Sequence, residues 1–182
     1  MIPYRPEPLT DFSLPANREA FDAALARVSQ ELGRTYPLVI AGEAIDTGRY
    51  LESYNPSAKD ELVGRVAKAG KAEIDKAIQA AWAAYETWSE MPAFERAGVL
   101  FKTAAILRRR KHEFSAWMLL EAGKSRAEAD ADTAEAIDFL EYYGRQMIEL
   151  SQRGDAVLTP LAGEDNHMDY IPLGVGAIIP PW

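Results

Sequence analysis

The stretch GVGAIIPPW, Gly174 to Trp182, decides how the rest of the sequence is interpreted. An apolar run of this kind is typical of a buried strand, and the two prolines end it because they cannot donate to a strand ladder. A buried strand needs neighbours on both edges and cover on both faces. We therefore expect these 182 residues to be the front part of a longer protein, which stops where a second domain begins.

The glycines of this stretch do not form a dinucleotide-binding loop. Gly174 and Gly176 lack the third glycine of that motif, and prolines stand where its helix should begin. The end of a strand in an α/β sheet is nevertheless where ligands tend to bind.

A turn-rich segment precedes the strand. Residues 156–160 and 167–172 are predicted to be two short strands around the tip Gly163-Glu164-Asp165-Asn166. Residues 155–173 would then form a projecting hairpin whose edges could pair with another subunit. A hairpin folded back on its own domain is an equally good interpretation.

Helical periodicity governs the middle of the chain. The pattern predicts helices over about 71–91, 93–110 and 112–122, and a fourth that begins at a capping box, Ser125 to Glu128, and ends near 152. The large aromatic side chains at helical spacing are predicted to be core residues; they are Trp82, Trp88, Phe101 and Trp117.

The first third is expected to be more irregular. A proline-rich arm over 1–16 precedes a helix predicted over 17–32, with Asn17 as its N-cap. Short strands are then predicted in antiparallel hairpins, at 36–40, 44–46, 50–54 and 62–67.

Composition excludes several classes of function. The formal net charge of −8 argues against nucleic-acid binding, and the basic cluster Arg108 to Lys111 is interpreted as the solvated end of a helix. The sequence has no cysteine, so these residues can form neither a disulfide nor a thiol nucleophile. We find no signal peptide and no apolar run long enough to cross a membrane, which makes the cytoplasm the default location.

The acidic residues between 128 and 138 could suggest a metal site. Only Glu128, Asp132 and Glu135 share a helix face, and a solvated surface explains them better, so no metal is predicted. Glu135 flanks the apolar stripe of Ile137 and could be partly buried beside a pocket. Neither histidine is assigned a role. The residues alone therefore show no catalytic set.

Several motifs together resemble the aldehyde dehydrogenase superfamily. They are Asn55-Pro56, Glu121-Ala122-Gly123-Lys124, the helix over 128–146, and Pro172 to Gly176 with the final Pro-Trp. Tyr36-Pro37-Leu38, residues 108–114, the same helix and Gly163 to Asn166 are most similar to the bacterial branch that oxidises L-glutamate γ-semialdehyde. The resemblance implies an α/β fold. It divides the chain into an arm and helix (1–34), hairpins and helices of the NAD-binding domain (35–154), an oligomerisation hairpin (155–173) and the first strand of a Rossmann-like core (174–182).

The resemblance also implies a chemistry. A cysteine thiolate would attack the aldehyde, a hydride would pass to NAD, and water would release glutamate. The cysteine, the general-base glutamate and most of the NAD pocket would lie outside this chain, which alone should be inactive. By resemblance, Ile179, Pro180, Pro181 and Trp182 would contact NAD, and Glu135 would meet the amino group of the substrate. A homo-oligomer would form through 155–173.

Two departures and two alternatives accompany this prediction. Ser125-Arg126 replaces a Pro-Trp-like pair and could alter helix packing, and Pro180 stands where serine or alanine is usual. One alternative is another member of the superfamily that takes a different aldehyde. The other is a stand-alone assembly module that uses the hairpin.

Overall fold

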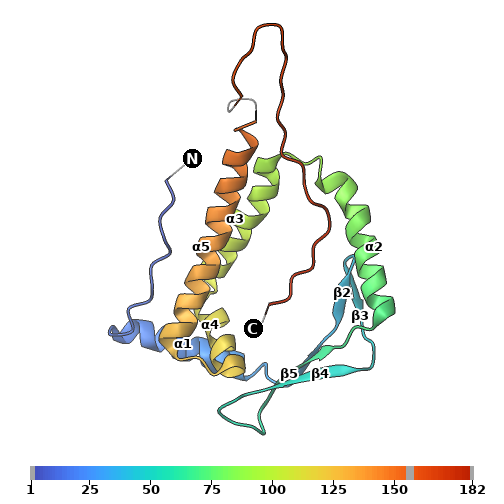
Figure 1. Ribbon diagram of the computed structural model, residues 1–182. Coiled ribbons are helices and arrows are strands. Elements are labelled where there is room, and N and C mark those ends of the chain that lie inside the picture. Colours follow the sequence, from blue (N-terminus) through green and yellow to red (C-terminus); the bar gives the residue numbers. More distant parts are fainter. Residues whose placement is uncertain (1–2, 155–157, 181–182) are drawn as a thin grey trace.

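A long helix, α5 (Arg126–Ser151), is the central element of the fold. The computed structural model describes residues 3–154 and 158–180. Helix α5 lies beside α3 (Ala93–Arg109), while α4 (Lys111–Ala122) and α1 (Pro15–Ser29) gather at one end, and α2 (Lys71–Trp88) stands apart (Figure 1). The strands are β1 (Arg34–Tyr36), β2 (Leu38–Ile40), β3 (Glu43–Ile45), β4 (Tyr50–Tyr54) and β5 (Leu62–Ala67).

The start of α5 follows the predicted capping box. The backbone N–H of Glu128 donates to the Ser125 hydroxyl at 3.3 Å, and the Glu128 carboxylate accepts from the Ser125 backbone N–H at 3.0 Å. This exchange satisfies two backbone donors that a helix start would otherwise leave without partners. Arg126 pairs with Asp22 at 2.6 Å and lies over the Phe21 ring, so the departure at 125–126 ties α5 to α1.

Close packing of α5 on α3 depends on a glycine. A Cβ atom added to Gly144 would come within 2.6 Å of the Phe101 ring. The missing side chain therefore lets the aromatic ring of α3 approach the backbone of α5. Ile137, on the same helix, is fully buried, as its apolar stripe predicted.

Helix α1 begins earlier than predicted. Pro15 occupies its first turn, where a missing N–H costs nothing, and no side chain caps it. Asn17 is not the N-cap; its side-chain amide donates to the carbonyl of Asp11 at 2.8 Å. Phe21, Ala24 and Val28 are buried, at the spacing of one helix face.

The predicted strand over 36–40 divides at Pro37. Residues before it form β1, which pairs in parallel with β5, and residues after it form β2, which pairs antiparallel with β3. Proline cannot donate to a ladder, so the chain leaves one sheet there and enters the other. The expectation of antiparallel hairpins is thus right for β2–β3 and β4–β5 and wrong for β1.

Helix α2 is amphipathic but uncovered. Trp82 is 48% exposed and Trp88 is 45% exposed, and no residue of α2 is buried. The prediction that these two tryptophans are core residues is therefore wrong here, whereas Phe101 and Trp117 are partly buried. The periodicity identified the apolar face, but a sequence pattern does not show which element covers that face.

The strands predicted over 156–160, 167–172 and 174–182 do not form within the described residues 158–180. This segment runs beyond the end of α5, turns back, and passes between the α3–α5 pair and α2 (Figure 1). A hydrogen bond from Glu164 N–H to the Leu161 carbonyl, at 3.2 Å, closes a turn beside Gly163. An extended segment becomes a strand only where a neighbour completes its ladder, and residues 158–180 contain no strand.

Candidate functional site

The outer face of α5 carries the predicted substrate residue. Glu135 is exposed and makes no hydrogen bond or ion pair with the described residues, so the expectation that it is partly buried is wrong. Phe139 lies one turn further along and stacks on Tyr143 at 5.7 Å between ring centroids. Tyr142 contacts Tyr143 edge to face at 5.6 Å. The sequence analysis missed this aromatic row, although its i, i+4, i+8 spacing from Glu135 predicts one face.

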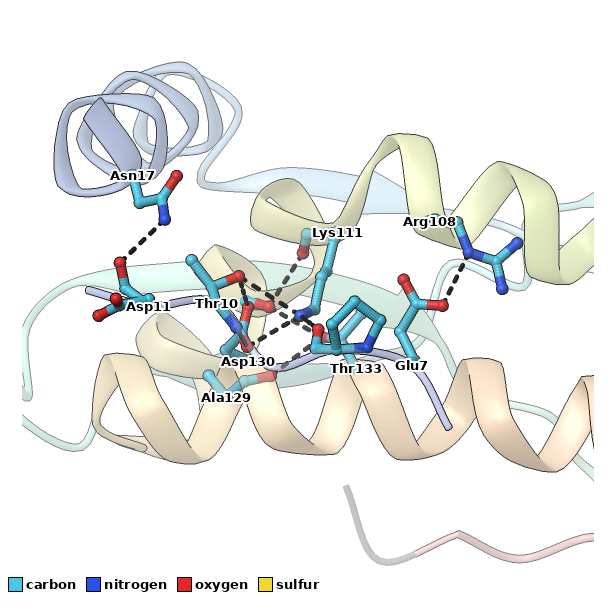
Figure 2. A network of polar contacts seen from close by, with 11 residues as sticks. Glu7, Thr10, Asp11, Asn17, Arg108, Lys111, Ala129, Asp130 and Thr133 are labelled. Carbon is cyan, nitrogen blue, oxygen red and sulfur yellow. Dashed lines mark hydrogen bonds and ion pairs between the residues drawn. The ribbon is translucent and has the colours of Figure 1, made fainter. Parts of the chain in front are cut away.

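The inner side of α5 holds a buried charge. Asp130 is 1% exposed, and its carboxylate accepts hydrogen bonds from the Thr10 backbone N–H at 2.8 Å, the Thr10 hydroxyl at 2.6 Å and the Lys111 ammonium at 2.9 Å (Figure 2). Burial acts to raise the pKa of Asp130, but the hydrogen bonds from Thr10 and Lys111 outweigh it and leave that pKa below its ordinary value. The carboxylate therefore stays ionised.

The proline-rich arm is bound along this side of the helix. The Glu7 backbone N–H donates to Asp138 at 2.7 Å, and the Glu7 carboxylate accepts from Arg108 at 2.7 Å. Lys111 also donates to the carbonyl of Pro8 at 2.9 Å. The prediction that the cluster Arg108 to Lys111 is only a solvated helix end is wrong for these two cations, because they fix the arm to the helices.

Aromatic contacts continue the attachment at both ends of the arm. Tyr4 meets Tyr142 edge to face at 5.8 Å, and Phe12 meets Phe21 of α1 at 5.6 Å. His112 lies against both phenylalanines, and burial lowers its pKa. A cleft of about 740 Å³ beside the arm has charged walls, and three of its cations, Arg108, Arg110 and Lys111, are already in ion pairs.

The segment that precedes the predicted cofactor residues contacts α2. Gly174 has a φ of 99°, and a Cβ atom there would lie 2.8 Å from the Trp82 ring. The small cavity of about 280 Å³ at this contact is lined by α2 and residues 174–176, and it does not include Glu135. Neither Glu135 nor the described cofactor residues Ile179 and Pro180 line this cavity.

The described residues fit one part of an NAD site. Ile179 is 90% exposed and Pro180 is also exposed, while Pro181 and Trp182 lie outside the described residues. An apolar side chain and a proline without an N–H could contact a flat ring, but neither side chain offers a donor to a pyrophosphate. Within the described chain we find no cluster of acidic or histidine side chains able to hold a metal ion. None of the described helices is long and apolar enough to cross a membrane.

Comparison with known proteins shows the class to which this fold belongs. The Aldehyde dehydrogenase family model matches residues 43–182. The chain therefore belongs to the aldehyde dehydrogenase family.

Its similar relatives share a more particular name. The chain is 58% identical to the 1-pyrroline-5-carboxylate dehydrogenase of Geobacillus kaustophilus and 55% identical to 1-pyrroline-5-carboxylate dehydrogenase 1 of Halalkalibacterium halodurans, each over 180 residues. These alignments cover 99% of this chain and 35% of each relative. The chain thus spans about a third of the length of the relatives it matches.

Solved structures agree with the sequence comparison. A Thermus 1-pyrroline-5-carboxylate dehydrogenase with bound NAD superposes with a TM-score of 0.88 at 48% identity, covering 95% of this chain and 33% of that one. The Mycobacterium tuberculosis enzyme bound with NAD gives 0.83 at 25% identity, covering 95% and 32%.

Proposed function

We propose that this chain is the N-terminal part of an NAD-dependent dehydrogenase that oxidises L-glutamate γ-semialdehyde to L-glutamate in proline breakdown. The observation that carries the proposal is the identity of up to 58% with 1-pyrroline-5-carboxylate dehydrogenases over 99% of the chain. The match to the general family model begins at residue 43, whereas the similarity to these dehydrogenases also includes the arm and α1. This difference points to the 1-pyrroline-5-carboxylate dehydrogenases rather than to the family in general.

The chain would contribute binding and orientation rather than the reacting groups. NAD, when bound, accepts the hydride. Ile179, Pro180, Pro181 and Trp182 would line one side of its site, and the Glu135 carboxylate would attract the ammonium group of the substrate. The sequence contains no cysteine, so the thiol nucleophile must come from outside these 182 residues.

Assembly and location follow as parts of the same proposal. Residues 155–173 would pair with a second copy of the chain to form a homo-oligomer. The arm and helix over 1–34 and the hairpins and helices over 35–154 would be the other two parts that precede it. Residues 174–182 would supply the first strand of a Rossmann-like core. A cytoplasmic location suits an enzyme that depends on a free thiolate.

The first test uses the protein as it is expressed in its natural source. Intact mass measures whether the natural product exceeds 20.2 kDa. NADH absorbance then measures turnover of L-glutamate γ-semialdehyde. We expect a much larger mass and activity that Glu135→Gln weakens by raising KM, whereas Glu86→Gln, an exposed change on α2, leaves KM unchanged. A larger product without activity on this aldehyde would contradict the substrate.

A second candidate function is a stand-alone assembly module. It is favoured by the segment that extends from α5, where Leu161, Tyr170 and Ile171 are exposed. This alternative requires that the natural product ends at Trp182 and forms a stable oligomer. Deletion of 158–173 would then abolish association, as measured by light scattering.

A further inference from the structure

The arm is attached to α5 on both sides of Glu135. Thr10 binds Asp130, five positions before Glu135, and Glu7 binds Asp138, three positions after it. The bonds therefore bracket the two turns of helix from which Glu135 projects.

The attachment is firm at both points. Asp130 is 1% exposed, and the Glu7 side chain is only 10% exposed in its pair with Arg108. Arg108 lies in the last turn of α3 and Lys111 begins α4, so the arm connects α5 to the junction of the two helices beside it. A shift of α5 along its axis would break several charged hydrogen bonds at once, each stronger than a neutral one.

An independent observation concerns which proteins share the arm. The general family model matches from residue 43 onward, so the arm and α1 lie outside it. The 1-pyrroline-5-carboxylate dehydrogenase of Geobacillus kaustophilus nevertheless aligns over 99% of the chain. The arm is therefore shared with relatives of one substrate class and is not a general requirement of the family.

We propose that the arm, residues 3–12, is a strap that positions Glu135 for the amino-acid end of the substrate. This inference rests on the proposed function. Thr10 is a positioning residue whose hydroxyl acts through Asp130, and Glu7 is one whose carboxylate acts through Arg108 while its backbone N–H binds Asp138. The strap fixes α5, and with it Glu135, relative to α3 and α4. It therefore governs how well a substrate with an ammonium group is bound. A plain aldehyde, which has no such group, does not depend on it.

The experiment weakens the strap from the arm side and leaves α5 unchanged. Thr10→Val with Glu7→Ala is compared with a control pair on the exposed face of α2, Thr87→Val with Glu86→Ala. KM and kcat of the natural full-length protein are measured with L-glutamate γ-semialdehyde and with butanal. Hydrogen exchange of the amides over 130–138 is followed without substrate.

We expect the strap variant to raise KM for the semialdehyde about fivefold or more, the effect of one lost hydrogen bond. Its kcat and its KM for butanal should stay within twofold of the wild type, and exchange over 130–138 should speed up. Thr10→Ser, which keeps the hydroxyl, should restore KM. The control pair should change none of these quantities.

Three outcomes would overturn the inference. The first is unchanged exchange over 130–138, because the arm then does not hold the helix; this result needs no activity. The second is an equal rise of KM for both aldehydes, which would indicate general destabilisation. The third is a wild-type protein that oxidises butanal but not the semialdehyde, which would refute the proposed function first and the strap with it.

Discussion

At the scale of single residues, Asp130 has the most demanding environment. A buried carboxylate is tolerated only when charged and hydrogen-bonding partners replace water, and Thr10 and Lys111 provide them. Asp130→Asn would leave the Lys111 ammonium buried without its counter-ion. We expect the free energy of unfolding to fall by about 3–5 kcal/mol, measured by urea denaturation.

A matched substitution separates burial from mere loss of charge. Asp22 pairs with Arg126, but both side chains are well exposed. Asp22→Asn should therefore cost less than about 1 kcal/mol. Equal losses for the two variants would show that the network around Asp130 does not depend on its burial.

His112 gives the molecule a pH dependence. Burial lowers its pKa below the ordinary value of 6.5, so the unfolded chain binds a proton more readily than the folded one. The stabilisation is complete above about pH 6.5 and is lost as the pH falls toward the lowered pKa of the folded state. We expect Tm to drop between pH 7.5 and pH 5.5, and the drop to shrink in His112→Phe. A variant whose Tm falls as steeply as the wild type would refute this assignment.

At the scale of elements, the start of α5 depends on its cap. Ser125→Ala removes the hydroxyl that accepts from the Glu128 N–H, and it should lower the free energy of unfolding by about 1 kcal/mol. Ser125→Asp can still cap the helix, so this variant should retain most of the stability that Ser125→Ala loses. Urea denaturation of the two variants tests the prediction, and an alanine variant as stable as the aspartate variant would contradict it.

Local sequence signals predicted where the helices and strands lie better than they predicted which elements pair or pack with one another. The capping box and the 3.6-residue period marked α5, α3 and α4 closely, because caps and apolar stripes are properties of neighbouring residues. The parallel pairing of β1 with β5 could not be predicted, because it joins segments about thirty positions apart. Lys111 was predicted to be solvated for the same reason: its partner Asp130 lies on another helix and Thr10 on the arm.

The site was predicted mainly through resemblance. Glu135 carries no local sign of its role, since an exposed glutamate on a helix is ordinary, and Ile179 and Pro180 have only an apolar pattern. The row of Phe139, Tyr142 and Tyr143 could have been found from helical spacing. The function of this row depends on which part of the protein packs against α5, and no local sequence pattern shows that.

At the scale of the whole molecule, apolar surface remains exposed on the C-terminal segment and on α2. Ile178 is 92% exposed and Ile179 is 90% exposed, and α2 presents Ile74 and Trp82. Contiguous apolar patches promote association. We expect the 182 residues expressed alone to form oligomers or aggregates in size-exclusion chromatography.

Charged substitutions identify the surface responsible. Ile178→Glu with Ile179→Lys should shift the elution toward the monomer. Phe94→Glu, at an exposed apolar position on α3, should shift it much less. A larger shift from Phe94→Glu would place the association surface elsewhere.

The arm also imposes an order on synthesis. Its residues leave the ribosome before α5 does, and Glu7 binds Asp138, which is made 131 positions later. At about 5–20 residues per second, the arm waits roughly 7–26 s for its binding site on α5. The nascent chain must therefore carry an undocked, proline-rich arm during this interval, and a chaperone or a protease could reach it then.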